Sequence, residues 1–161
     1  MLLTRRKHQV PPQPLSWFRN LIECLGNKLT IHVAFKDGQP ASGILTLFSK
    51  DCCVYKYSCS DPKFSSSAAT VYLLWHVIKD AKVKGATEID MGRCDIANEG
   101  LATFKEHWNA TRSSLVYYRS PVVSRDHANG GRRAKLAQHL FAKAPDWMLI
   151  TLGNLLYKHV G

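Results

Sequence analysis

Residues 29–59, LTIHVAFKDGQPASGILTLFSKDCCVYKYSC, decide the fold of this chain. Apolar residues alternate with polar or small ones over the first eight positions, and a period of two is typical of a strand with one buried face. Asp37-Gly38 favours a hairpin turn, and Lys50-Asp51 supplies the next turn. The pattern places His32 on the polar, solvent-facing side. It predicts three consecutive antiparallel strands, at 29–35, 41–49 and 53–59.

Helices are expected on both sides of these strands. Residues 18–25 carry apolar side chains at helical spacing, with Ser16 as the expected cap. Residues 67–84 predict the longest helix, which has one apolar stripe and Gly85 as its stop. A strand at 87–91, a helix at 98–108 and a strand at 115–119 complete the order. The chain is therefore expected to be an α/β or α+β domain with a mixed sheet.

Two basic segments flank the expected domain at residues 15–120. Residues 1–14 read as a flexible, proline-broken arm, and residues 121–161 as a helical extension with helices at 132–141 and from Pro145 onward. The net charge of +10 divides into +3 from residues 1–8, +5 from residues 119–161 and +2 from the remainder. Surplus charge for solubility, contact with phosphate or RNA, and contact with an anionic membrane all fit this distribution. Packing on the domain is favoured for the extension over lying on a membrane.

The chain shows no pattern of secretion, membrane spanning or metal binding. Its longest apolar stretch, residues 147–157, falls short of the roughly 20 residues that a membrane helix needs, and no signal peptide is expected. The five cysteines are odd in number and lack Cys-x-x-Cys spacing, so reduced thiols are expected and no metal site. These features favour the cytoplasm, with association at the inner face of the membrane left open.

Charged residues gather most densely between Asp90 and Trp108. They follow a predicted strand, and ligands of α/β sheets bind at the carboxyl ends of strands. The alternative is a solvated loop before a helix that is capped by Asn98 or Asp95. Ser65, Ser66 and Ser67 precede the long helix, where free N–H groups can receive a phosphate or carboxylate, although serine also caps helices without any ligand.

Five motifs follow one another along the chain, at Tyr55–Pro62, Leu73–Trp75, Ile89–Asp95, Asn98–Leu101 and Phe104–Trp108. In this order they resemble the GNAT acyltransferase superfamily, and in particular the C-terminal acyltransferase-like domain of the Fem-type family. That family includes the peptidoglycan bridge aminoacyltransferases and related proteins of polysaccharide export and cellulose loci. The resemblance covers residues 15–120 and only the second of two tandem domains. No glycine occurs between Gly43 and Gly85, so the chain departs from the Gly-rich phosphate loop of acetyl-CoA-dependent members.

The resemblance implies transfer of an acyl or aminoacyl group from acyl-CoA or an aminoacyl-tRNA to an amine, such as that of a cell-envelope precursor. Lys105 is the strongest catalytic candidate, as a donor to the oxyanion, with Arg93 as the alternative. The serines before the long helix would hold the donor phosphates. Candidates for proton removal are Asp90, Asp95 and Glu99. Candidates for substrate contact are Lys56, Tyr57, Asp61, Arg93, Asn98 and Trp108.

These side chains are expected to converge on one concavity beside the long helix. An open acceptor side would require a second copy, a partner domain or the C-terminal extension to cover it. Binding of tRNA is expected if the donor is an aminoacyl group. The alternative function is a non-catalytic half-domain that binds a partner chain without turnover.

Overall fold

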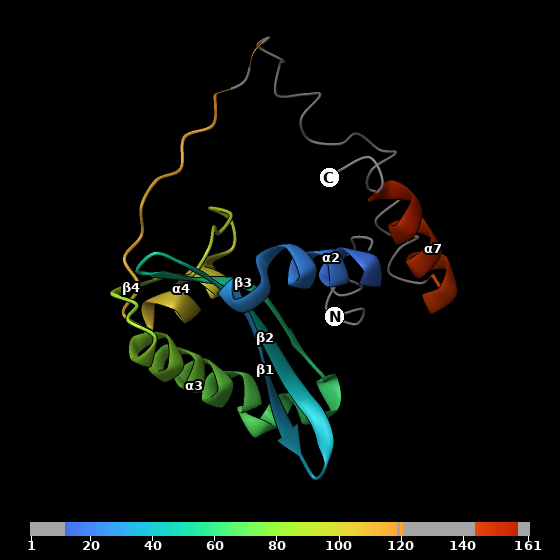
Figure 1. Cartoon of the computed structure of the whole chain (residues 1–161), viewed down its shortest axis with the longest axis horizontal. Helices are drawn as coiled ribbons and strands as arrows, with labels where there is room; N and C mark the ends of the chain where they lie inside the picture. Colours follow the sequence, from blue (N-terminus) through green and yellow to red (C-terminus); the bar gives the residue numbers. More distant parts are fainter. Residues whose placement is uncertain (1–11, 119, 121–143, 158–161) are drawn as a thin grey trace. The chain divides into compact units, whose positions relative to one another are not determined.

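A computed structural model describes residues 12–118, 120 and 144–157, except the side chains of residues 65–67. The chain divides into two compact units, one built mainly on Leu15–Asn109 and the other on Thr4–Pro14 and Ala110–Gly161. Residues 1–11 of the predicted arm and the predicted helix at 132–141 lie outside the described residues. Figure 1 shows the elements of both units.

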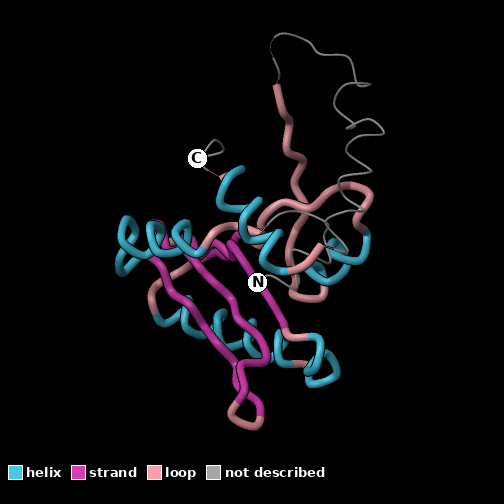
Figure 2. Tube along the Cα trace, turned by 90° about the vertical axis from the view of Figure 1, so that its right-hand side faces the viewer, coloured by secondary structure: helices cyan, strands magenta, loops and turns pink. Residues whose placement is uncertain are grey.

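The first unit contains one four-stranded mixed sheet with strand order β1-β2-β3-β4 (Figure 2). The predicted meander is confirmed, because the first three strands pair antiparallel in sequence order. The last strand joins the third in parallel. The strands are β1 (Leu29–Lys36), β2 (Gln39–Ser49), β3 (Cys52–Ser60) and β4 (Glu88–Asp90).

The prediction of a strand at 115–119 is wrong for residues 115–118, which form no regular secondary structure. Residue 119 lies outside the described residues. The apolar side chains of residues 115–118 are exposed to solvent. Residues of high β-propensity form a strand only where another strand offers backbone partners, and no strand of the described part pairs with these. Local propensity alone was therefore a misleading signal here.

The helices agree with the predicted order. α2 (Leu15–Leu25) includes Ser16 inside the helix, so the expectation that Ser16 caps it is wrong. α3 (Ala69–Val83) is the longest helix among the described residues. α4 (Glu99–Glu106) is capped by Asn98, whose Oδ1 accepts from Leu101 N at 3.2 Å. α7 (Asp146–Leu156), in the second unit, begins after Pro145 as predicted. No helix of the described residues is long and apolar enough to cross a bilayer.

The two faces of the sheet carry different helices. On one face Ile44 packs with three buried residues of α3 to form the core, and the partly buried Phe104 of α4 and Trp108 pack against this cluster. Leu45 and its register partner Tyr57 point to the opposite face, where the ring of Tyr57 meets Phe18 of α2 edge-on at 5.6 Å. The core residues from α3 are Leu73, Leu74 and Val77.

The orientation of β1 reverses the expectation for His32. His32 is partly buried against α3, with its Nε2 at 3.6 Å from the Asp80 carboxylate, and burial lowers its pKa. Ile31, Val33 and Phe35, which alternate with it, are the exposed residues. The alternation of residue types along β1 separates the two faces of the strand, but it does not say which face a helix covers. In the structure the longer helix, α3, covers the face that carries His32.

Candidate functional site

The two parallel strands, β3 and β4, are paired over a short stretch and then separate. β3 and β4 are in register only from Cys52 to Val54, and the chain leaves the sheet after Asp90. β3 continues to Ser60, and no described strand pairs with it there on the side of β4. The register with β2 also shifts, because Leu45 faces Tyr57 while Thr46 faces Tyr55, which leaves Lys56 as an extra residue. Such a bulge commonly lies next to functional sites.

The open edge of β3 offers backbone groups to a ligand. Asp61 N donates to Ala41 O at 2.9 Å and so points toward β2. Along a strand, successive residues direct their amide groups to opposite sides. Because Asp61 points toward β2, Ser60 and Ser58, one and three positions before it, direct theirs away from β2. An extended molecule that contains amides can pair with such an edge as an added strand would.

The loop after β4 is held in place by a lysine. Asp90 Oδ1 accepts from Gly92 N at 2.7 Å, and Gly92 adopts a left-handed backbone at φ 71° that favours glycine. Lys105 Nζ donates to Gly92 O at 2.5 Å and to Arg93 O at 3.1 Å. The ammonium group of Lys105 therefore fixes the loop where the two strands part.

Lys105→Met should lower both thermal stability and turnover. A hydrogen bond from a charged donor contributes about 1.5 to 3 kcal/mol, and the partial exposure of Lys105 places the expected loss at the lower end, or several degrees of melting temperature. Lys79→Met, whose Nζ lies 5.7 Å from the exposed Trp75 ring, is the matched control and should change little. A Lys105→Met protein that keeps the parent melting temperature while losing turnover would favour a purely chemical role.

A cavity of about 440 Å³ lies on the face of the sheet that α2 covers. Its walls are mostly apolar and include Phe18 and Tyr57, and Asp61 is the acidic residue among those that line it. Asp61 Oδ1 also accepts from Lys63 N at 2.9 Å, so the carboxylate caps the turn that follows β3. An apolar cavity with one carboxylate suits a cationic group on an organic molecule.

The predicted site residues fall into separate places rather than one concavity. Tyr57 and Asp61 line the cavity just described. Asp90, Arg93, Asp95 and Lys105 line neither this cavity nor a second one, between β1 and α3, which is described in the next paragraph. Trp108, expected to contact substrate, packs against the hydrophobic core. Lys56 stands at the bulge of β3 with its Nζ 6.0 Å from the Tyr57 ring. Asp95, Asn98 and Glu99 lie in the loop and first turn of α4.

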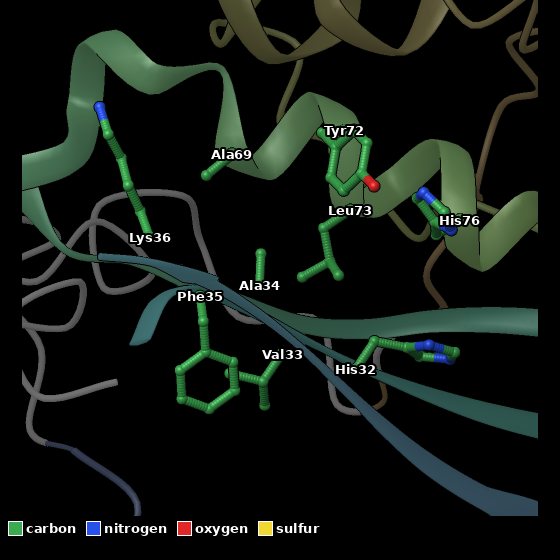
Figure 3. A pocket seen from close by; sticks show the side chains of 9 residues that line it. All are labelled: His32, Val33, Ala34, Phe35, Lys36, Ala69, Tyr72, Leu73 and His76. Atoms are coloured by element: carbon green, nitrogen blue, oxygen red, sulfur yellow. The ribbon is translucent and has the colours of Figure 1, made fainter. Parts of the chain in front are cut away.

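Sequence reasoning missed a second cavity, of about 530 Å³, between β1 and α3 (Figure 3). His32 and Ala34 line it from β1, and Tyr72, Leu73 and His76 from α3. The Tyr72 and His76 rings, one helical turn apart, lie 4.5 Å from each other. The i, i+4 spacing of Tyr72 and His76 on the predicted helix is the sequence signal that could have indicated this cavity. Among the described residues, no group of three His, Cys, Asp or Glu side chains is arranged to hold a metal.

Several solved structures share this fold. An aminoglycoside N-acetyltransferase, AAC(6′)-Iy, solved with the bisubstrate analogue CoA-S-monomethyl-acetylneamine, matches with a TM-score of 0.56 at 14% identity over 73% of this chain and 87% of its own. Glucosamine-6-phosphate N-acetyltransferase from Arabidopsis thaliana matches with a TM-score of 0.50 at 14% identity over 66% and 76%. An aminoglycoside 6′-N-acetyltransferase from Acinetobacter haemolyticus matches with a TM-score of 0.53 at 13% identity over 68% and 81%.

At the level of sequence, no curated protein matches this chain. The family model of the acetyltransferase (GNAT) domain, in contrast, matches residues 2–106, which is more than half of the chain. The mixed α/β fold of the chain agrees with that match. The chain therefore belongs to the GNAT acetyltransferase family.

Proposed function

We propose that this protein transfers an acyl group from a coenzyme A thioester to an amine, with the donor along the open edge of β3 and the acceptor in the cavity beside α2. The observation that carries the proposal is the separation of β3 from β4 at the Lys56 bulge. The fold neighbour solved with a molecule that joins coenzyme A to an amine acceptor supports the choice of both substrates.

The pantetheine arm of coenzyme A is an extended chain that contains two amide groups. Amides of this kind would pair with the outward-facing backbone of Ser58 and Ser60 in the manner of an added strand. The donor phosphates would then lie near Ser65, Ser66 and Ser67, which end the 3-10 helix Pro62–Ser67, and near the first N–H groups of α3, which favour anions. The acyl carbon would come to the bulge, between the Asp90 loop and the cavity.

Ser58→Pro tests the pairing with the donor. Proline removes the outward N–H of residue 58, and loss of one hydrogen bond should raise KM for acyl-CoA by about 3- to 10-fold. Ser58→Ala is the matched control, because it also removes the hydroxyl but keeps the N–H, and should leave KM unchanged. Circular dichroism would confirm that both variants fold. Equal KM values for the two variants would contradict this placement of the donor.

In the reaction, the amine loses a proton and its nitrogen attacks the thioester carbonyl carbon. The resulting tetrahedral oxyanion collapses, the C–S bond breaks, and the coenzyme A thiolate takes up a proton. Asp90 ends β4, and Asp95 and Glu99 follow in the loop and in the first turn of α4. These three carboxylates stay candidates for the base. Lys105, which donates to two carbonyls, would act by positioning the loop, and Arg93 stays the other candidate cation for the oxyanion.

The finer assignment is to a Fem-type transferase that acts on a cell-envelope precursor, with aminoacyl-tRNA as the alternative donor. It rests on the motifs of residues 55–62 and 89–108. The non-catalytic half-domain that needs a partner chain is the competing function.

A substrate panel separates these alternatives. Acetyl-CoA, longer acyl-CoA thioesters and charged tRNA are each combined with an aminoglycoside, an amino sugar or a muropeptide precursor, and product is detected by mass spectrometry. Turnover with acyl-CoA supports the proposal, and turnover only with charged tRNA supports the aminoacyl alternative. Thermal stabilisation by these compounds without any product would favour the half-domain.

A further inference from the structure

One buried hydroxyl joins β2, β3 and α3. Ser42 of β2 is 4% exposed, and its Oγ donates to Cys59 O of β3 at 3.1 Å. The same Oγ lies 3.0 Å from Oγ1 of Thr70, in the first turn of α3. A hydroxyl carries one hydrogen, and that of Ser42 is directed to Cys59, so Thr70 is the donor in the second bond. A hydroxyl link of two hydrogen bonds therefore runs from Thr70 through Ser42 to Cys59.

The start of α3 is not capped by its own N-cap residue. That residue is Ala68, which has no side-chain oxygen and adopts a left-handed backbone at φ 51°. The 3-10 helix Pro62–Ser67 before it is kinked at Phe64, whose backbone is not helical. The hydrogen bond from Thr70 to the buried Ser42, in contrast, ties the first turn of α3 directly to the sheet.

The two ends of the hydroxyl link lie beside the two places where the donor is proposed to bind, and the inference rests on that proposed function. Cys59 lies between Ser58 and Ser60, whose outward backbone groups would pair with the pantetheine amides. Thr70 belongs to the first turn of α3, where the N–H groups of a helix have no intrahelical partner and favour phosphates. One molecule of coenzyme A would therefore contact β3 next to one end of the link and α3 next to the other.

We propose that Ser42 and Thr70 are positioning residues for the donor, which fix the spacing between the open edge of β3 and the start of α3. A ligand with two joined parts gains affinity from the joining only when its two sites are held at the span of the molecule. Holding that spacing before the ligand arrives lowers the cost of binding the whole molecule. A smaller ligand that contacts only one of the two places gains nothing from the hydroxyl link.

Thr70→Val tests this role, because valine removes the hydroxyl but keeps the side-chain shape and the backbone N–H of residue 70. Thr70 lines neither cavity, whereas Ser42 is among the residues that line the cavity beside α2. NMR titration would give Kd for coenzyme A and, separately, for pantetheine and adenosine bisphosphate, which are parts of it. Kd for coenzyme A should rise about 3- to 10-fold, as expected for one lost hydrogen bond. Kd for each of the two parts should not change.

Three further variants separate positioning from other effects. Thr70→Ser retains a hydroxyl and should restore the parent Kd for coenzyme A. Ser42→Ala breaks both hydrogen bonds, and adding Thr70→Val to it should weaken the binding of coenzyme A no further, because both residues act through one link. Thr151→Val is the matched control, since Thr151 Oγ1 donates to Trp147 O at 2.8 Å within α7, and it should keep the parent Kd.

Thermal denaturation would show that all variants fold. An unchanged Kd for coenzyme A in Thr70→Val would overturn the positioning role. So would a Kd for pantetheine or adenosine bisphosphate that rises as much as that for coenzyme A, because the hydroxyl would then act on one place alone. A parent chain that binds no coenzyme A would contradict the proposed donor and this inference with it. That result is distinct from the others, because it is seen before any residue is changed.

Discussion

Asp61→Asn is expected to raise KM for a cationic amine acceptor by about 10- to 100-fold, since a hydrogen bond to a charged group contributes roughly 1.5 to 3 kcal/mol. Asp61 is the acidic residue among those that line the cavity beside α2. Asparagine removes the charge but keeps an oxygen for Lys63 N, and asparagine caps turns and helices as well as aspartate does. KM for the acyl donor should not change. Steady-state kinetics with each substrate varied in turn would measure both values.

Asp37→Asn is the matched control for this prediction. Asp37 lies at the β1–β2 turn with φ 51°, a conformation that asparagine also adopts, and it lines neither cavity. The two substitutions change the net charge equally, so a general electrostatic effect would appear in both. Equal KM values in the two variants would place the acceptor elsewhere.

Leu74→Ala is expected to cost about 2 to 5 kcal/mol of unfolding free energy, because a buried leucine leaves both lost burial and a cavity. Leu74 is completely buried, at 0% exposure, between α3 and the sheet. For a unit of this size, a loss of 1 kcal/mol lowers the melting temperature by roughly 4 to 8 °C, so a fall of about 10 °C or more should be seen by calorimetry.

Val71→Ala provides the comparison on the same helix. Val71 is 47% exposed and lies outside the core, so its truncation should change the unfolding free energy by less than about 0.5 kcal/mol. Similar melting temperatures for the two variants would mean that α3 is not packed on the sheet as described here. The pair thus tests the packing of the long helix directly.

Parts of the site could be predicted from sequence and parts could not. Asn98 was a correct candidate for the helix cap because capping depends on residues three positions apart. The family resemblance predicts Tyr57 and Asp61 as substrate contacts, and both line one cavity. The same resemblance predicts Trp108 as a substrate contact, yet Trp108 packs on the core, since no local pattern shows what a side chain meets across the fold.

By itself, the sequence determined the three-stranded meander, the long helix after it and the order of elements that matches the GNAT family. Turn residues and periodicity act between near neighbours, so a single chain displays them. Only the tertiary structure decided that His32 rather than Val33 faces α3, that Lys56 is the bulged residue, and that Lys105 holds the loop after β4. Each of these three features depends on which distant segment packs against the residue. That packing is determined by which apolar surfaces of the whole unit become buried together.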